Sequence, residues 1–229
     1  MGFILVNWHV FLLAFFISYI LGSLNSAVII TKIFTKGGDI RMMGSGNAGF
    51  TNVLRSVGKL PAVLTIIFDV LKSVAAVAIG GWIFMMLSAG MTDSDAVIRV
   101  GKYLCGLFCI IGHSFPVFFK FRGGKGIVTA ASMMLVADWR VFLVILATFL
   151  IVFVLSKIIS LGSIISACMF PVYTIGFCLI DFFFFGYPGW YVYECTVTAF
   201  IITVFVIIKH SSNIKRLIRG EEKKIRAKK

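Results

Sequence analysis

The chain has 229 residues, of which 60% are hydrophobic and only 14% are charged. A water-soluble domain could not bury this much apolar surface, so the composition excludes an ordinary globular protein and indicates an integral membrane protein. The net charge of +13 does not indicate a nucleic-acid-binding protein, because the basic residues gather in the C-terminal tail and in short gaps between apolar runs.

Six apolar stretches are candidates to cross a bilayer whose hydrocarbon core is about 30 Å thick. In chain order they cover residues 3–24, 61–87, 97–119, 141–155, 161–180 and 190–208. A shorter apolar stretch, residues 127–137, lies between the third and the fourth. It predicts a short or tilted additional helix, so the expected fold is an all-α integral membrane protein with seven transmembrane helices, one of them short.

The distribution of positive charge favours seven crossings over six. With the N-terminus outside, nine basic residues of the inner loops and nine of the tail from Lys209 onward fall inside, whereas only Arg99, Lys102 and Arg140 fall outside. Because basic residues flank membrane spans mainly on the cytoplasmic side, we expect a cytoplasmic C-terminus and a single multi-pass domain over residues 1–229. The basic tail, residues 221–229, is expected to lie on anionic lipid and to do no more than that.

The first unusual inner segment is MMGSGNAGFTNVLRSVGK, residues 42–59. It combines glycines, which let main-chain N–H groups converge, with neutral hydrogen-bonding side chains and one arginine, whose planar fork suits phosphate oxygens. The residues concerned are Gly44, Ser45, Gly46, Asn47, Thr51, Asn52 and Arg55. An ordinary loop would not need so many donors, so this segment predicts an anion-binding site.

The second segment is GHSFPVFFKFRGGKGIVTA, residues 112–130. Three glycines, Gly123, Gly124 and Gly126, leave the main chain free to wrap around a phosphate, and Lys125 provides positive charge at the centre. A helix that starts after Gly126 would direct its positive N-terminal end, with Thr129 in its first turn, to the same place. The alternative interpretation is a charged loop between two spans. ATP binding is not expected, because Gly126 occupies the Ser/Thr position of a P-loop.

Other polar residues near the inner side are less specific. Ser160 and Ser163 flank Gly162 at the start of a span, where hydroxyl groups often cap a helix or bond back to its carbonyls. Asp69 and Lys72 are three residues apart within a span and are expected to form a mutually compensating pair, although intramembrane charges also suggest function. We find no HExxH motif and no cluster of acids, so neither a metal nor another cofactor is expected.

Taken together, these segments resemble the PlsY-type bacterial glycerol-3-phosphate acyltransferases. The matching stretches are LGSLNSAVI, GSGNAGFTNVLR, IFDVLKS, GHSFPVFFKFRGGKGIVT, SLGS and KHSSNIKRLIRGEE. The resemblance implies a monomeric bacterial cell-membrane enzyme with its active site on the cytoplasmic side. It would move a fatty acyl group from acyl phosphate to the sn-1 hydroxyl of glycerol 3-phosphate, with membrane lipid and no nucleic acid as partner. Ala48, Phe50, Ser73 and Ser211 stand where the family usually has other residues.

The resemblance also implies roles for individual residues. The catalytic set would be Ser45, Asn47, Arg55, Lys125, Ser163, His210 and Asn213. The substrate-binding set would be Gly44, Gly46, Thr51, Asn52, His113, Gly123, Gly124, Gly126 and Thr129. The alternative function is a transporter or binding protein for a phosphorylated metabolite, which would require polar residues throughout the spans. The outer halves of the spans are instead rich in Phe, Ile and Val.

Overall fold

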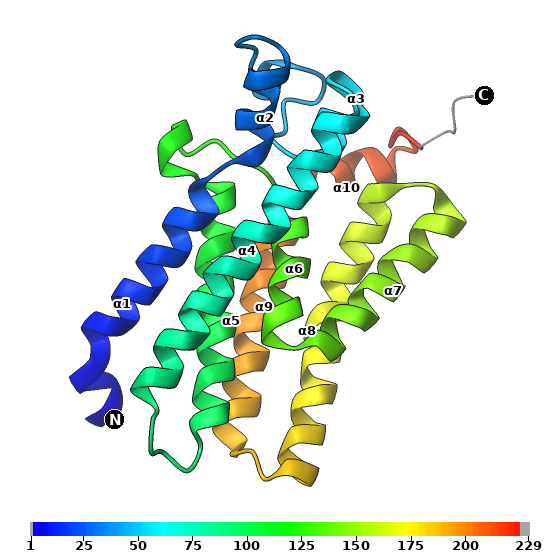
Figure 1. Cartoon of the computed structure of the whole chain (residues 1–229). Helices are drawn as coiled ribbons and strands as arrows, with labels where there is room; N and C mark the ends of the chain where they lie inside the picture. The colour runs from blue at the N-terminus through cyan, green and yellow to red at the C-terminus, as the bar shows by residue number, and fades with distance from the viewer. Residues whose placement is uncertain (1, 225–229) are drawn as a thin grey trace. The chain divides into compact units, whose positions relative to one another are not determined.

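The computed structural model describes residues 2–224, with side chains from Asn7 onward. Over that range the secondary structure is entirely helical, with ten α-helices and two short 3-10 helices (Figure 1). The helices form two compact units, Met1–Ala137 and Asp138–Lys229. The expected all-α class is therefore confirmed for the described residues.

The first unit contains helices α1 to α6. Their bounds are α1 Gly2–Ser23, α2 Ser26–Phe34, α3 Phe50–Ser56, α4 Lys59–Leu87, α5 Ser94–Ser114 and α6 Ile127–Ala137. Helices α1, α4 and α5 pack against one another, and α6 packs against α4 and α5 (Figure 1). The contact between α1 and α5 is close because a Cβ atom at Gly22 or Gly112 would collide with the main chain of the opposite helix, as is typical of small residues in membrane helix packing.

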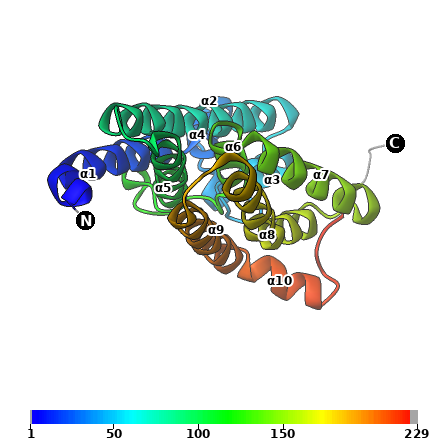
Figure 2. The ribbon, with the colours of Figure 1, turned by 90° about the horizontal axis from the view of Figure 1, so that it is seen from below.

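The second unit contains helices α7 to α10, with bounds α7 Trp139–Ser156, α8 Ile159–Phe185, α9 Gly189–Lys209 and α10 Ser211–Ile218. Helix α8 packs against both α7 and α9. The chain turns at His210, and the short helix α10 extends sideways from the end of α9 (Figure 2).

A buried ionic cluster joins the three long helices of this second unit. The guanidinium of Arg140 donates to both carboxylate oxygens of Asp181, at 2.8 Å each, and to Asp138 at 2.9 and 2.7 Å. The hydroxyl of Tyr191 also donates to Asp181, at 2.9 Å. Because Asp138 and Asp181 are only 4% and 3% exposed, this arginine stabilises α7 against α8 and α9 by satisfying two buried carboxylates.

The six long predicted spans agree with the structure in approximate position, whereas a seventh crossing by residues 127–137 stays a prediction. Within residues 2–224, six helices are long and apolar enough to cross a membrane, and the additional apolar element, α6, has 11 residues. At 1.5 Å per residue, α6 is about 16 Å long, or roughly half of the hydrocarbon core. Helix α8 runs to Phe185 rather than ending near Ile180, so the loop between α8 and α9 is shorter than expected, and α5 ends at Ser114 rather than near Phe119.

Candidate active site

Asn52 shapes the first glycine-containing loop of the first unit. From its buried position in α3, its Nδ2 atom lies 3.1, 2.9 and 3.0 Å from the carbonyl oxygens of Ile40, Met43 and Asn47, which share its two N–H donors. Its Oδ1 atom accepts the main-chain N–H of Ser45 at 3.0 Å. The amide is thus engaged by the main chain, so Asn52 holds the loop in shape rather than offering its amide to a ligand.

The loop that Asn52 holds leaves its remaining polar groups near the surface. Gly44 and Gly46 adopt positive φ angles of 54° and 70°, a conformation that side-chain-bearing residues avoid. Ser45 between them is exposed, and so is Arg55 in the last turn of α3. Thr51 lies in the first turn of the same helix.

The second glycine-rich loop, residues 122–126, packs directly on the first. The N–H groups of Gly123 and Gly124 donate to the carbonyl oxygens of Ser114 and His113, at 3.2 Å each. A Cβ atom at Gly124 would collide with both the His113 ring and the carbonyl of Ala48. Only glycine can therefore let the two loops approach this closely.

Arg41 connects the segment before the first loop to the segment before the second. Its guanidinium donates to the carbonyl oxygen of Phe119 at 2.7 Å and forms an ion pair with Asp39 at 2.6 Å. Hydrogen bonds from Arg41 lower the pKa of Asp39 despite the opposing effect of partial burial. Neither residue was among those suggested by the sequence motifs, because an Asp-x-Arg spacing carries no signal of a contact 78 residues away.

Lys125 is half-buried between the glycines, and α6 begins two residues later. Gly126 has a φ angle of +79° and passes close to Ser114. The hydroxyl oxygens of Ser114 and Thr129 are fully buried and have no hydrogen-bond partner among the described residues. Because buried hydroxyl groups are rarely left unsatisfied, these two are candidates to bond a ligand or water at the base of the loop.

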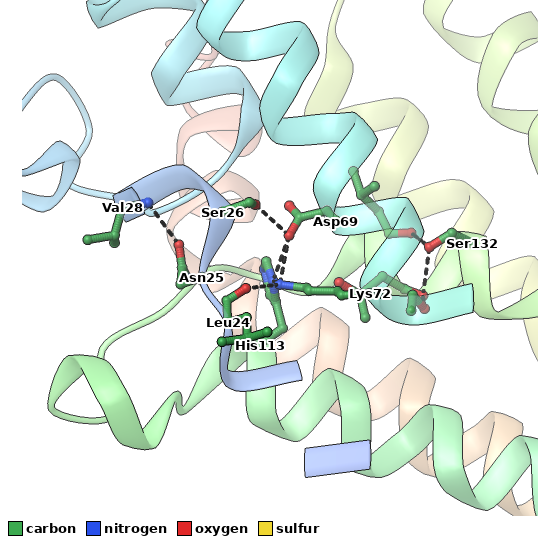
Figure 3. A network of polar contacts seen from close by, with 11 residues as sticks. Leu24, Asn25, Ser26, Val28, Asp69, Lys72, His113 and Ser132 are labelled. Carbon is green, nitrogen blue, oxygen red and sulfur yellow. Dashed lines mark hydrogen bonds and ion pairs between the residues drawn. The ribbon is translucent and has the colours of Figure 1, made fainter. Parts of the chain in front are cut away.

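A buried polar network joins α2, α4 and α5 (Figure 3). The ammonium group of Lys72 lies 2.7 Å from Asp69 Oδ1, 2.9 Å from His113 Nδ1 and 3.0 Å from the carbonyl oxygen of Leu24. The hydroxyl of Ser26 donates to the same Asp69 oxygen at 2.7 Å. The expected pairing of Asp69 with Lys72 is confirmed, and the structure adds His113 to it.

A second polar cluster lies in the second unit and centres on Glu222. This carboxylate accepts hydrogen bonds from Ser160 at 2.8 Å, Asn213 at 2.9 Å and Arg216 at 2.6 Å. Burial raises its pKa, but the bonds from Arg216, Ser160 and Asn213 together outweigh this and lower it. The expectation that the tail from residue 221 onward only contacts lipid is therefore wrong for Glu222, since its side chain is 7% exposed and holds α10 to α8. Ser160 likewise does not cap its helix, because its hydroxyl donates to this carboxylate.

His210 lies at the turn between α9 and α10 and is 3% exposed. Its Nδ1 atom is 2.8 Å from the carbonyl oxygen of Val206. A carbonyl can only accept, so Nδ1 carries the proton, and Nε2 of the neutral ring has a lone pair with which to accept one. Ser163 is buried in the second turn of α8 of the same unit.

Most of the suggested residues belong to the first unit, in its two glycine-containing loops or in the flanking helices α3, α5 and α6. These are Gly44, Ser45, Gly46, Asn47, Thr51, Asn52, Arg55, His113, Gly123, Gly124, Lys125, Gly126 and Thr129. Ser163, His210 and Asn213 belong to the second unit. Such features define a helical protein with long apolar helices and cationic, glycine-rich loops.

Comparison with known proteins identifies the family. The profile of the family described as glycerol-3-phosphate acyltransferase matches residues 12–220. The glycerol-3-phosphate acyltransferase of Prochlorococcus marinus (strain MIT 9312) is 38% identical over 214 residues, which cover 93% of this chain and 97% of the relative. That of Thermoanaerobacter sp. (strain X514) is 38% identical over 209 residues, 91% of this chain and 92% of the relative.

Solved structures agree with this result. The chain is similar to the crystal structure of PlsY (YgiH), an integral membrane glycerol 3-phosphate acyltransferase, in its glycerol 3-phosphate form, with 30% identity and a TM-score of 0.73. The match covers 94% of this chain and 96% of that one. The lysophosphatidic acid form of the same protein gives a TM-score of 0.72. The chain belongs to the glycerol-3-phosphate acyltransferase family.

Proposed function

We propose that this chain transfers a fatty acyl group from acyl phosphate to the sn-1 hydroxyl of glycerol 3-phosphate and releases lysophosphatidic acid and inorganic phosphate. Family membership and the PlsY match make it an integral membrane acyltransferase of the PlsY type. The glycerol 3-phosphate and lysophosphatidic acid forms of PlsY support the same acceptor and product here. The observation that carries the proposal is the pair of joined loops with Lys125 and Arg55, which supplies two cations for phosphate.

The chemistry of an acyl phosphate agrees with the residues present. In the proposed step the acceptor hydroxyl oxygen forms a bond to the acyl carbon, the bond from that carbon to phosphate oxygen breaks, and phosphate leaves. The hydroxyl proton passes to a phosphate oxygen or to Nε2 of His210. Because an acyl phosphate is a mixed anhydride with a good leaving group, the protein needs to position and neutralise its substrates rather than supply a nucleophile.

We assign roles to the catalytic residues on this basis. Lys125 and Arg55 neutralise phosphate charge, since bringing two anionic substrates together is costly in a partly dry site. Ser45 and Asn47 add neutral hydrogen bonds from the first loop, with Thr51 beside them. Ser163, His210 and Asn213 orient the acceptor hydroxyl group. Gly44, Gly46, Gly123, Gly124 and Gly126 let the two loops adopt their shape and approach each other closely, and Thr129 contributes a buried hydroxyl.

The donor is tested with purified protein in nanodiscs. Lysophosphatidic acid should form from glycerol 3-phosphate with acyl phosphate as donor, and not at a comparable rate with acyl-CoA. In the same assay Lys125→Ala should lower kcat/KM by roughly 30- to 1000-fold, the loss expected when a charged hydrogen bond to phosphate is removed. Lys224→Ala, an exposed tail lysine, should change it little. Equal rates with acyl-CoA, or equal effects of the two alanine variants, would contradict the proposal.

We further propose that the chain lies in the bacterial cell membrane as a monomer, with its N-terminus outside and the loops at Ser45 and Lys125 facing the cytoplasm. The excess of basic residues in those loops supports this orientation. In a variant lacking the five native cysteines, a cysteine at Ser45 should resist an impermeant thiol reagent applied to intact cells and react after permeabilisation. Labelling in intact cells would reverse the proposed orientation.

A further inference from the structure

All three N–H donors of the intramembrane Lys72 have an acceptor within the fold. An ammonium group carries three N–H donors and no acceptor. The three polar atoms around Nζ are Asp69 Oδ1, His113 Nδ1 and the carbonyl oxygen of Leu24, at 2.7, 2.9 and 3.0 Å. Each donor therefore has one acceptor, and the side chain of Lys72 is only 6% exposed.

This arrangement decides which nitrogen of His113 carries its proton. Because a charged lysine can only donate, Nδ1 must accept, and the proton of the neutral ring is then on Nε2. In the opposite tautomer Nδ1 would carry the proton and would have to donate it to Asp69. Asp69 Oδ1 is, however, 3.5 Å from Nδ1 and only 2.7 Å from the lysine, and Ser26 donates to the same oxygen. The geometry favours a charged Lys72 paired with Asp69 and a neutral His113 (Figure 3).

The opposite edge of the His113 ring faces the phosphate-binding loops. A Cβ atom placed on Gly124 would collide with Nε2 of His113 and also with the carbonyl oxygen of Ala48. Nε2 therefore lies at the point where the second loop, residues 122–126, passes the first. His113 also holds the second loop through its own carbonyl oxygen, which accepts the N–H of Gly124.

We propose that Lys72 is a positioning residue for acyl transfer: with Asp69, it holds His113 as the neutral tautomer protonated on Nε2. The ring then presents one fixed N–H donor to the junction of the two loops. A buried ion pair in a membrane span is costly, and a helix contact alone could be made by apolar residues. The ion pair adds control of the histidine tautomer. It prevents the ring next to the anion site from exchanging its donor nitrogen and its acceptor nitrogen.

Imidazole nitrogen NMR of the full-length protein in nanodiscs tests the tautomer directly. With the three histidines labelled with nitrogen-15 and assigned through His9→Gln and His210→Gln variants, His113 should show its proton on Nε2. In Lys72→Met, Nδ1 loses its donor and faces Asp69, so the proton should move to Nδ1 or the ring should become doubly protonated. Lys72→Arg should restore the wild-type signature. A wild-type ring protonated on Nδ1, or a Lys72→Met spectrum identical to wild type, would overturn the proposal.

Kinetics supply a second readout, through two substitutions of the ring itself. Glutamine can place an N–H donor near the position of Nε2, whereas asparagine reaches only the position of Nδ1. We therefore expect His113→Gln to retain roughly 10-fold more kcat/KM than His113→Asn, the value of about one hydrogen bond. Their thermal unfolding should be similar, and equal kinetics for the two variants would contradict the role of the Nε2 donor.

The kinetic arm rests on the proposed acyl-transfer function, but the NMR arm does not. If the wild-type protein showed no acyl transfer, the proposed function would fail while the tautomer could still be measured. Lys102→Met is the matched control, because Lys102 is a partly buried lysine nearer the other end of α5. It should leave both the His113 signature and the kinetics unchanged, and if it shifted the signature as Lys72→Met does, the effect would not be specific to Lys72.

Discussion

Replacing Glu222 with glutamine is the sharpest test of the cluster in the second unit. The wild-type carboxylate accepts three hydrogen bonds, from Ser160, Asn213 and Arg216. Glutamine is nearly isosteric and retains one acceptor oxygen, so the bonds from Ser160 and Asn213 can persist in weakened form. The second oxygen becomes an amide NH2, which turns a donor toward the Arg216 Nε–H, and that bond is lost.

The magnitude follows from these three bonds. A hydrogen bond to a charged group contributes about 1.5–3 kcal/mol and a neutral one about 1 kcal/mol. The value for Arg216 belongs at the low end, because that side chain is 38% exposed and solvent screens the ion pair. Losing one such bond and weakening two predicts a total cost of about 2–3 kcal/mol. If about half of this reaches the transition state through a misplaced Asn213, kcat/KM falls by roughly 5- to 15-fold.

Two measurements check this prediction, with Glu221→Gln as control because Glu221 is exposed. Acyl-transfer kinetics should show the loss for Glu222→Gln and little change for the control. The pKa of Glu222 is lowered in the folded protein, so its carboxylate stabilises the fold above its unfolded pKa of about 4.3. That contribution is lost as the pH falls through the folded pKa. The difference in thermal stability between wild type and variant should therefore shrink below about pH 4, and a difference that grows there, or identical behaviour of the two variants, would refute the reasoning.

Three further substitutions test other parts of the structure. Gly124→Ala should lower activity at least about 30-fold because its Cβ atom has no space between the loops, whereas Gly176→Ala, with nothing within 4 Å, should be neutral in the same assay. Asn52→Ala should destabilise the protein by about 2–4 kcal/mol, since it removes the bonds that shape the first loop, as measured by unfolding in detergent. Arg140→Met should cost about 3–5 kcal/mol in the same measurement, because it leaves two buried carboxylates without a cation, and activity should fall only as far as folding does.

The spans and the polar loops could be predicted because their signals are local. Apolar length and the position of basic residues give the helices directly, and glycine density marks both loops near residues 44–49 and 122–126. The spacing of Asp69 and Lys72 places them on one face of a helix, and the structure confirms that they pair.

The residues that sequence reasoning missed act through contacts distant in the chain. Glu222 lies within a basic tail whose composition suggests only a lipid contact, yet its partner Ser160 is 62 residues away. The link from Arg41 to Phe119 spans 78 residues. The number of charged residues does not show which of them form ion pairs or hydrogen bonds, because helix packing determines those contacts. Asn52 illustrates a different limit, because an amide in a polar loop can bind a ligand or the loop itself, and its sequence context is the same in both cases.

His113 and His210, at the C-terminal ends of α5 and α9, show how the fold gives one residue type opposite properties. His210 places Nδ1 against the carbonyl oxygen of Val206, so that nitrogen must donate and Nε2 must accept. His113 places Nδ1 against Lys72, so that nitrogen must accept and Nε2 must donate. Under the proposed function this difference has a chemical meaning. A hydrogen-bond donor suits loops that bind an anionic phosphate, whereas an acceptor suits the substrate hydroxyl group that loses its proton. Exchanging the two properties, as Lys72→Met would begin to do for His113, should therefore impair the reaction even where the fold survives.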